Sequence, residues 1–219
     1  VGDVQTRQAM LISSFGQRLW SDMTFGTLSS DGRLVFSIED QELSFGGALF
    51  RMGRVAARNP RAIATMNGEP TSAFNRLAAY DLRTGKLQWN LGGPEGHYAL
   101  RQAETFFLGP PLPLMGQLYV LGEIKGEIKL MALEPGTGDL LWSQQLAVVE
   151  QGVAQDMLRR VAGVSPSYAD GVLVCPTSTG AVVGIELATR SLLWGYRCGQ
   201  DRDRRRMMGM GLGGIGMTH

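Results

Sequence analysis

The sequence is poor in the residues that define several functional classes. Only two cysteines, Cys175 and Cys198, occur among 219 residues, which excludes a disulfide-dense scaffold and a four-thiolate zinc site. Only two histidines occur, His97 and His219, and these are too few for a histidine-based metal centre. The 21 basic and 20 acidic residues nearly cancel, so no overall field attracts nucleic acid or anionic lipid.

Long apolar helices are missing as well. The longest uncharged stretch of interest, residues 105–122, contains Pro110, Pro111 and Pro113 and would make a poor membrane helix. No signal peptide is visible and residue 1 is Val, so we expect a processed chain or a fragment. Glycine, by contrast, is abundant at 30 residues, which favours a turn-rich, all-β chain over a helical bundle.

Tryptophan marks an internal repeat. Trp89, Trp142 and Trp194 follow one another at spacings of 53 and 52 residues (142 − 89 and 194 − 142). Each ends a similar segment, in which a short apolar strand, an acidic residue and a tight turn lead to a second strand ending in Trp. These segments are residues 77–89, 130–142 and 182–194. We expect each large indole to pack against the neighbouring repeat and fix the angle between the two.

The turn residues of these segments predict hairpins. Asp81 stands where it can accept hydrogen bonds from its own turn, and Gly85 and Gly138 can adopt the positive φ that closes a short loop. Arg190 replaces that glycine in the third copy, so its loop should differ or be slightly strained.

Another predicted hairpin precedes each of these three segments in the sequence. Its turn dipeptides are Asp31-Gly32, Met115-Gly116 and Asp170-Gly171, of which the two Asp-Gly pairs are the stronger hairpin signals. The strands that follow are short and apolar, which predicts that both of their faces are buried.

Four antiparallel strands in a unit of about 40–50 residues are typical of a β-propeller blade, so the expected fold is all-β. Residues 1–197 would form a propeller segment and 198–219 an Arg/Met/Gly-rich flexible tail. The expected blades are 20–89 (with an inserted loop at 40–73), 104–142 and 164–194, and the apolar spacing in 149–162 predicts a short helix between blades. Because three blades leave two open edges, we expect either further blades of a longer chain or an extra strand from residues 1–19.

The pattern Ala-x-Asp-x-x-Thr-Gly-x-x-x-Trp at 79–89 resembles the tryptophan-docking repeat of the pyrroloquinoline-quinone-type (PQQ-like) β-propeller family. The resemblance covers three copies, is good in the second and is degenerate in the third. It implies a partial propeller of about three blades, in which Trp89, Trp142, Trp194, Gly85, Gly138 and Asp81 are structural repeat residues. The family includes quinoprotein dehydrogenases, which bind the quinone and calcium, and members similar to the outer-membrane assembly lipoprotein, which bind partners without a cofactor.

The quinone-binding branch fits this sequence less well. Its members carry adjacent cysteines, whereas Cys175 and Cys198 lie 23 positions apart (198 − 175). No Asp or Glu can be assigned as calcium ligand or catalytic base, so we assign no catalytic residue, metal ligand or cofactor-binding residue and expect no cofactor. A Cys175–Cys198 disulfide and two free thiols both remain open.

These observations favour a non-catalytic binding platform whose loops, especially 40–73 and 149–163, contact a protein or an extracellular polymer. Nucleic acid is not an expected partner, and any membrane association would be indirect. The expected location is periplasmic, extracellular or in the cell envelope. The alternatives are a segment of a PQQ-dependent dehydrogenase, with PQQ and calcium, or a propeller that binds a small ligand or ion at its axis.

Overall fold

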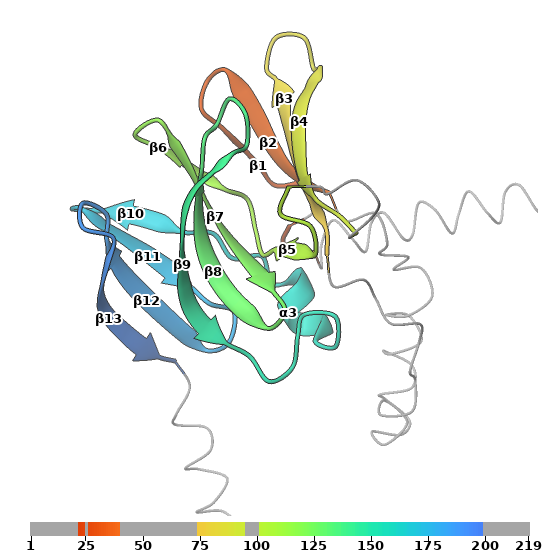
Figure 1. Cartoon of the computed structure of the whole chain (residues 1–219). Coiled ribbons are helices and arrows are strands. Elements are labelled where there is room, and N and C mark those ends of the chain that lie inside the picture. The colour runs from red at the N-terminus through yellow and green to blue at the C-terminus, as the bar shows by residue number, and fades with distance from the viewer. Residues whose placement is uncertain (1–21, 25, 40–73, 95–100, 199–219) are drawn as a thin grey trace, which may run out of the picture.

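A computed structural model describes residues 22–24, 26–39, 74–94 and 101–198 (Figure 1). The expected insertion at 40–73, the extra strand at 1–19, the tail from residue 199 onward, and His97 and His219 all lie outside the described residues. The insertion does fall inside the first blade, because the strands on either side of it pair with each other.

Three antiparallel sheets follow one another along the chain, and in two of them the spatial order of the strands is their order in the sequence. The first sheet contains β1 (Leu28–Ser30), β2 (Leu34–Glu39), β3 (Arg76–Asp81) and β4 (Leu87–Gly92). The third contains β10 (Ser167–Ala169), β11 (Val172–Pro176), β12 (Ala181–Glu186) and β13 (Ser191–Arg197).

The middle sheet has five strands where four were expected. They are β5 (Thr105–Phe107), β6 (Leu112–Leu114), β7 (Gln117–Ile124), β8 (Glu127–Leu133) and β9 (Leu140–Val148). Both β5 and β6 pair with β7, at its two ends. Between them lie Pro110 and Pro111, which have no N–H to give to a ladder, so the first strand of this blade is split in two.

Two of the three predicted turn dipeptides form tight two-residue hairpin turns, and the third does not. Met115-Gly116 and Asp170-Gly171 both form two-residue loops in which both residues have positive φ, the geometry of a type I′ turn. Asp31-Gly32 instead opens a longer loop, because the Asp31 carboxylate accepts hydrogen bonds from the backbone N–H groups of Arg33 and Leu34. The weaker dipeptide therefore makes the tighter turn.

Each repeated tryptophan lies next to a β-bulge. The register shifts between Ala79 and Tyr80, between Ala132 and Leu133, and between Gly184 and Ile185, opposite the residue that precedes Trp in each copy. A bulge bends its strand and redirects the neighbouring side chain. The expectation that these strands end at Trp was wrong, because β4, β9 and β13 all pair on beyond it.

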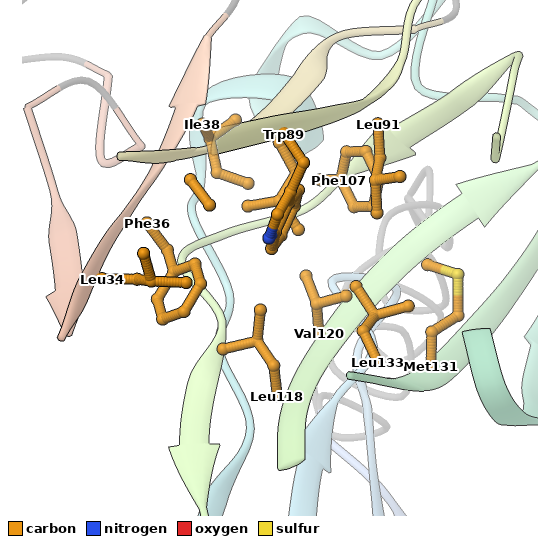
Figure 2. Close-up of a cluster of buried hydrophobic side chains, with 12 residues drawn as sticks. Leu34, Phe36, Ile38, Trp89, Leu91, Phe107, Leu118, Val120, Met131 and Leu133 are labelled. Carbon is orange, nitrogen blue, oxygen red and sulfur yellow. The ribbon is translucent and has the colours of Figure 1, made fainter. Parts of the chain in front are cut away.

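Two hydrophobic clusters hold the three sheets together, and the middle sheet contributes to both. Its alternating side chains divide between the two sides, with Leu118, Val120, Met131 and Leu133 facing the first sheet (Figure 2). Tyr119, Leu121, Leu130 and Ala132 face the third sheet, where they meet Leu173, Cys175, Val183 and Ile185.

Burial on both faces, predicted for all three repeats, is therefore correct only for the middle one. Strand β7 is buried almost throughout, whereas β2 and β11 alternate between buried and half-buried residues. The physical reason is position, since each outer sheet has a packed neighbour on one side alone among the described residues. Successive meandering sheets packed face to face form a partial β-propeller, the fold that the sequence predicted (Figure 1).

Candidate functional site

The contact between the first and second blades is centred on Trp89. Its indole N–H donates to the carbonyl oxygen of Pro135 at 2.8 Å, within the turn that joins β8 to β9. The ring also lies over Gly138, where an added Cβ would come within 2.9 Å of the indole. Trp89 is only 6% exposed and packs on Phe36 at a centroid distance of 5.9 Å (Figure 2). A glycine in the turn thus makes room for the tryptophan of the preceding blade.

The contact between the second and third blades has the same plan with other residues. Trp142 meets Tyr119 edge-on at 5.9 Å, and the Arg190 guanidinium lies 5.2 Å from the indole centroid. Arg190 occupies the turn position of Gly138 and has φ 59°, a left-handed conformation that costs energy for a residue with a side chain. The cation–π contact with Trp142 offsets part of that cost.

The third tryptophan has no such neighbour among the described residues. Trp194 is 43% exposed and lies against Gly184 of its own sheet. Every residue of β13 is exposed. The three repeat tryptophans therefore occupy equivalent places in their sheets but sit in three different environments.

Asp81 holds its own turn, as its position suggested. Its carboxylate accepts from the N–H groups of Arg83 and Thr84 and from the Thr84 hydroxyl. These hydrogen bonds, with the one from the Thr84 hydroxyl largest, lower the pKa of Asp81. Gly85 follows with φ 67° and donates its N–H to the Asp81 carbonyl at 2.8 Å.

Asn75, which the sequence analysis did not single out, ties the first blade to the second. It is 3% exposed. Its amide nitrogen donates to the Phe107 carbonyl at 2.9 Å, and its amide oxygen accepts from the Phe107 N–H at 2.7 Å. One side chain thus supplies both hydrogen bonds that a strand would otherwise exchange with β5, at the point where β3 begins.

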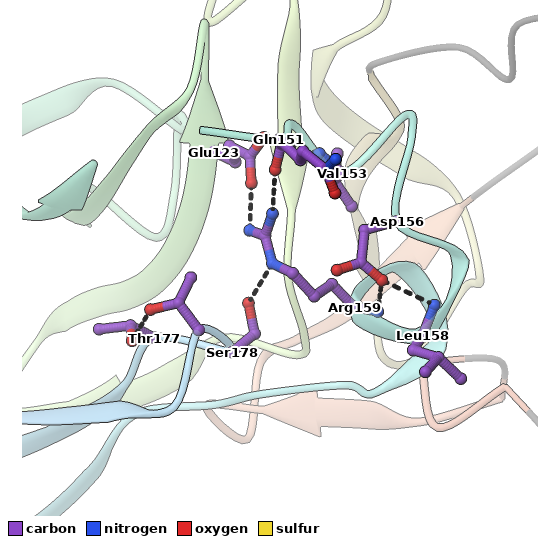
Figure 3. A network of polar contacts seen from close by, with 9 residues as sticks. Glu123, Gln151, Val153, Asp156, Leu158, Arg159, Thr177 and Ser178 are labelled. Atoms are coloured by element: carbon purple, nitrogen blue, oxygen red, sulfur yellow. Dashed lines mark hydrogen bonds and ion pairs between the residues drawn. The ribbon is translucent and has the colours of Figure 1, made fainter. Parts of the chain in front are cut away.

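The connection between the second and third blades, residues 149–166, contains α3 (Met157–Val161), which is much shorter than the expected helix. Asp156 caps it, because its carboxylate accepts from the N–H groups of Leu158 and Arg159 (Figure 3). Val153, counted in the expected helical stripe, is instead buried between the blades, with its N–H donated to Glu123 at 2.8 Å. Because of this cap and this contact, the helix begins only at Met157.

A buried ion pair fixes this connection. Arg159 is 9% exposed and Glu123 is 4% exposed, and the guanidinium of Arg159 pairs with the Glu123 carboxylate. The other guanidinium nitrogens donate to the Gln151 carbonyl at 2.8 Å and to the Ser178 hydroxyl at 3.4 Å (Figure 3). The pair joins β7, α3 and the β11–β12 loop, and so holds residues 149–163 in place. The exposed residues of this connection include Leu158, at 81%, beside the polar Glu150, Gln151 and Gln155.

The sequence contains one indication of this ion pair that the sequence analysis did not use. Glu123 is a lone acid within the apolar run of β7, and Arg159 and Arg160 interrupt an apolar stripe. A charge in such a place requires a partner of opposite sign. Nothing in the sequence pairs these two residues with each other, because 36 positions separate them.

Both cysteines are free thiols, which resolves the alternative that the sequence left open. Cys175 is buried in the second core cluster and Cys198 is exposed. Burial raises the pKa of the Cys175 thiol to about 12.

Side chains that bind metal ions do not gather anywhere in the described part of the chain. No group of three or more His, Cys, Asp or Glu side chains in this part of the chain could hold a metal ion. Trp89 and Trp142 each contact a turn of the next blade. Within the described ranges, no helix has the length and hydropathy that a membrane span needs.

Sheets that dock in series through a tryptophan on the following turn define a β-propeller of the PQQ-like repeat class. The family model described as "Outer membrane protein assembly factor BamB" matches residues 15–210, and the chain belongs to this family. No curated protein matches the chain significantly.

Solved structures that resemble the chain include BamB from Moraxella catarrhalis, at 15% identity and a TM-score of 0.40 over 57% of this chain and 37% of that one. A quinohemoprotein alcohol dehydrogenase from Pseudomonas putida HK5 matches at 14% identity and a TM-score of 0.36, over 56% of this chain and 24% of that one. The computationally designed Ika8 protein matches at 14% identity and a TM-score of 0.37, over 79% of this chain and 36% of that one. The chain thus spans between about a quarter and a little more than a third of the length of these proteins.

Proposed function

We propose that the chain is a non-catalytic β-propeller module that binds another protein of the cell envelope through the connection 149–163. Membership in a family described as an outer-membrane assembly factor supports a protein partner and an envelope location. The observation that carries the proposal is the fixed connection itself. A buried ion pair and a capped helix hold a connection that presents one large apolar side chain, Leu158, to solvent.

The energetics of the connection favour recognition over a structural role alone. Placing Glu123 and Arg159 out of water costs energy that a buried apolar pair would not. In return, the ion pair holds residues 149–163 in one conformation, in which the Leu158 side chain is 81% exposed to solvent. A preorganised loop loses less entropy when it binds, and an exposed leucine on a fixed helix can enter a partner's pocket.

The test is site-specific photocrosslinking in cells that produce the protein. A benzophenone amino acid at position 158 should yield a discrete, protease-sensitive crosslinked band, and Glu123→Gln should weaken it by freeing the loop. The matched control is the same photoprobe at Met115, which is 71% exposed on a turn of the middle blade and should yield no such band. Equal crosslinking from both positions, or a band that only glycosidases remove, would contradict a protein partner at this connection.

The enzymatic alternative has its own measurement. Titration of the chain with PQQ and Ca²⁺ should leave its tryptophan fluorescence without a saturable change, because no described cluster of ligands is available. Saturable binding with dye-linked alcohol oxidation would overturn the non-catalytic assignment.

A further inference from the structure

The C-terminal end of α3 is contacted by residues that lie far away in the sequence. The helix has only five residues, and so short a helix is not stable without support from outside. The last carbonyl groups of a helix also need donors that the helix cannot supply. Here the Met23 N–H donates to the carbonyl oxygen of Val161, the last residue of α3, at 2.9 Å. We call residues 22–24 the anchor segment.

Gly163 allows the anchor segment to come this close. It follows the C-cap residue Ala162 and has φ 59°, the left-handed conformation in which many helices end. A Cβ added at Gly163 would lie 2.7 Å from the Met23 Cβ and 2.9 Å from the Met23 carbonyl carbon. A backbone atom cannot move aside as the end of a flexible side chain can. The anchor segment therefore packs directly on the end of the helix.

The helix does not close its own C-terminal end. In a common helix C-terminal motif, the N–H two residues beyond the C-cap turns back and bonds to the last turn. That residue is Val164, and its N–H instead donates to the Leu108 carbonyl at 2.9 Å, between β5 and β6. The chain beyond the helix is thus bound to the middle blade, and the helix end depends on contacts from outside the connection.

The anchor segment has a fixed conformation of its own. Asp22 and Thr24 are 2% and 6% exposed, whereas the Met23 side chain between them is 64% exposed. The Asp22 carboxylate accepts from the Thr24 N–H at 3.0 Å and from the Thr24 hydroxyl at 2.6 Å. The Thr27 hydroxyl donates to the Met23 carbonyl at 2.9 Å, and β1 begins at the next residue. The anchor segment therefore leads directly into the first blade.

We propose that the anchor segment positions α3 for partner binding, by holding the C-terminal end of the helix through the Met23 N–H and the contact with Gly163. The other end is held by the Asp156 cap and the buried ion pair, so Leu158 is presented between two fixed ends. The role in binding rests on the proposed function, whereas the effect on the helix does not.

This contact also differs from the packing between blades. Each hydrophobic cluster joins the middle sheet to one of its neighbours. The bond from Met23 to Val161 instead joins the segment before the first blade to the connection that leads into the third. A change in the anchor segment should therefore reach α3 without passing through either cluster.

Hydrogen–deuterium exchange of the purified full chain, read by mass spectrometry, tests the proposal. Met23→Pro removes the N–H that bonds to Val161, and Gly163→Ala places a methyl group against the backbone of the anchor segment. Each should speed exchange over residues 157–164 at least tenfold, while β7 and β8 exchange as in the wild-type chain.

Two substitutions serve as matched controls. Met23→Ala changes an exposed side chain and keeps the N–H, and Gly85→Ala adds a methyl group at φ 67°, where no described residue lies within 4 Å. Both should leave exchange over residues 157–164 unchanged. Unchanged exchange there in Met23→Pro or Gly163→Ala, a rise that extends equally to β7 and β8, or a rise in either control would overturn the proposal.

The photoprobe at position 158 tests the role in binding. Its crosslinked band should weaken at least tenfold in Met23→Pro and Gly163→Ala and should persist in the two controls. Faster exchange with undiminished crosslinking would show that the anchor segment holds α3 without serving partner binding, which overturns that role. Absence of any band from the wild-type chain would contradict the proposed function alone, because the exchange measurement involves no partner.

Discussion

At the scale of single residues, tryptophan occupies the equivalent position in all three repeats but is buried to a different extent in each. Its contribution to stability depends on what the next blade places over it, because the energy of an indole follows the area and contacts that it buries. The repeat pattern in the sequence predicted where these residues fall but not this gradient. The gradient depends on which neighbours are present, and the residues 77–89, 130–142 and 182–194 look nearly alike.

Alanine substitution should reveal the gradient directly. Trp89→Ala is expected to lower the free energy of unfolding by about 3–5 kcal/mol, the usual range for a buried aromatic. Trp142→Ala should lower the free energy of unfolding by less, and Trp194→Ala by the least, because Trp194 is 43% exposed. Urea denaturation of the three variants measures the order, and equal losses at all three positions would contradict unequal docking.

The two thiols should differ as strongly. In the folded chain at pH 8, Cys198 should react with a disulfide reagent such as Ellman's within minutes, whereas Cys175 should remain unreacted, because burial blocks access and raises its pKa to about 12. One thiol should therefore titrate in native buffer and two in denaturant without reductant. Two fast thiols in the native state would show that the second core cluster opens.

At the scale of elements, the connection 149–163 shows where pattern-based prediction ends. The spacing of Val149, Val153, Met157 and Val161 fits a helix, yet only Met157–Val161 is helical. Two hydrogen-bond acceptors decide the outcome. Glu123 on β7, outside the segment, accepts from the Val153 N–H, and Asp156, within the segment, caps the helix that follows. A local pattern contains no information about a partner 30 positions away.

Breaking the ion pair on one side should be costly. Glu123→Gln leaves the Arg159 guanidinium buried without a counter-charge and is expected to cost about 3–5 kcal/mol of stability, with part of the loss recovered in Glu123→Gln/Arg159→Met. The matched control is Glu104→Gln, whose pair with Lys125 is exposed and should contribute about 0–1 kcal/mol. Similar losses for both glutamate variants in chemical denaturation would contradict a structural role for the buried pair.

The strands were predicted more completely than the connections. Turn residues and apolar runs located most of the strands, because a hairpin is set by neighbours in the chain. The split of the first strand in the middle blade was visible only as Pro110 and Pro111. The bulge beside each tryptophan had no signal at all, since register depends on the partner strand.

At the scale of the whole molecule, the arrangement is a series of sheets in which only the middle one is covered on both faces. The first sheet carries polar residues on its outward face, Ser37 and Tyr80, where the middle sheet has Val120 and Leu133. The proposed function rests on the same arrangement, since docked sheets hold the described connection between them in a fixed position. The sequence identified the fold and the family through the repeat, but it did not reveal which loop is held or by what.

The most direct test of this account compares two glycine turns that differ only in whether a tryptophan lies over them. Gly85→Ala and Gly138→Ala both place a side chain at a similar positive φ, but only the second one meets the Trp89 ring, at 2.9 Å. We predict that Gly138→Ala lowers the free energy of unfolding by about 1–3 kcal/mol more than Gly85→Ala, the cost of overpacking, and that this excess disappears in a Trp89→Ala background. Equal penalties in the wild-type chain, or an excess that persists without the indole, would contradict docking of each blade on the turn of the next.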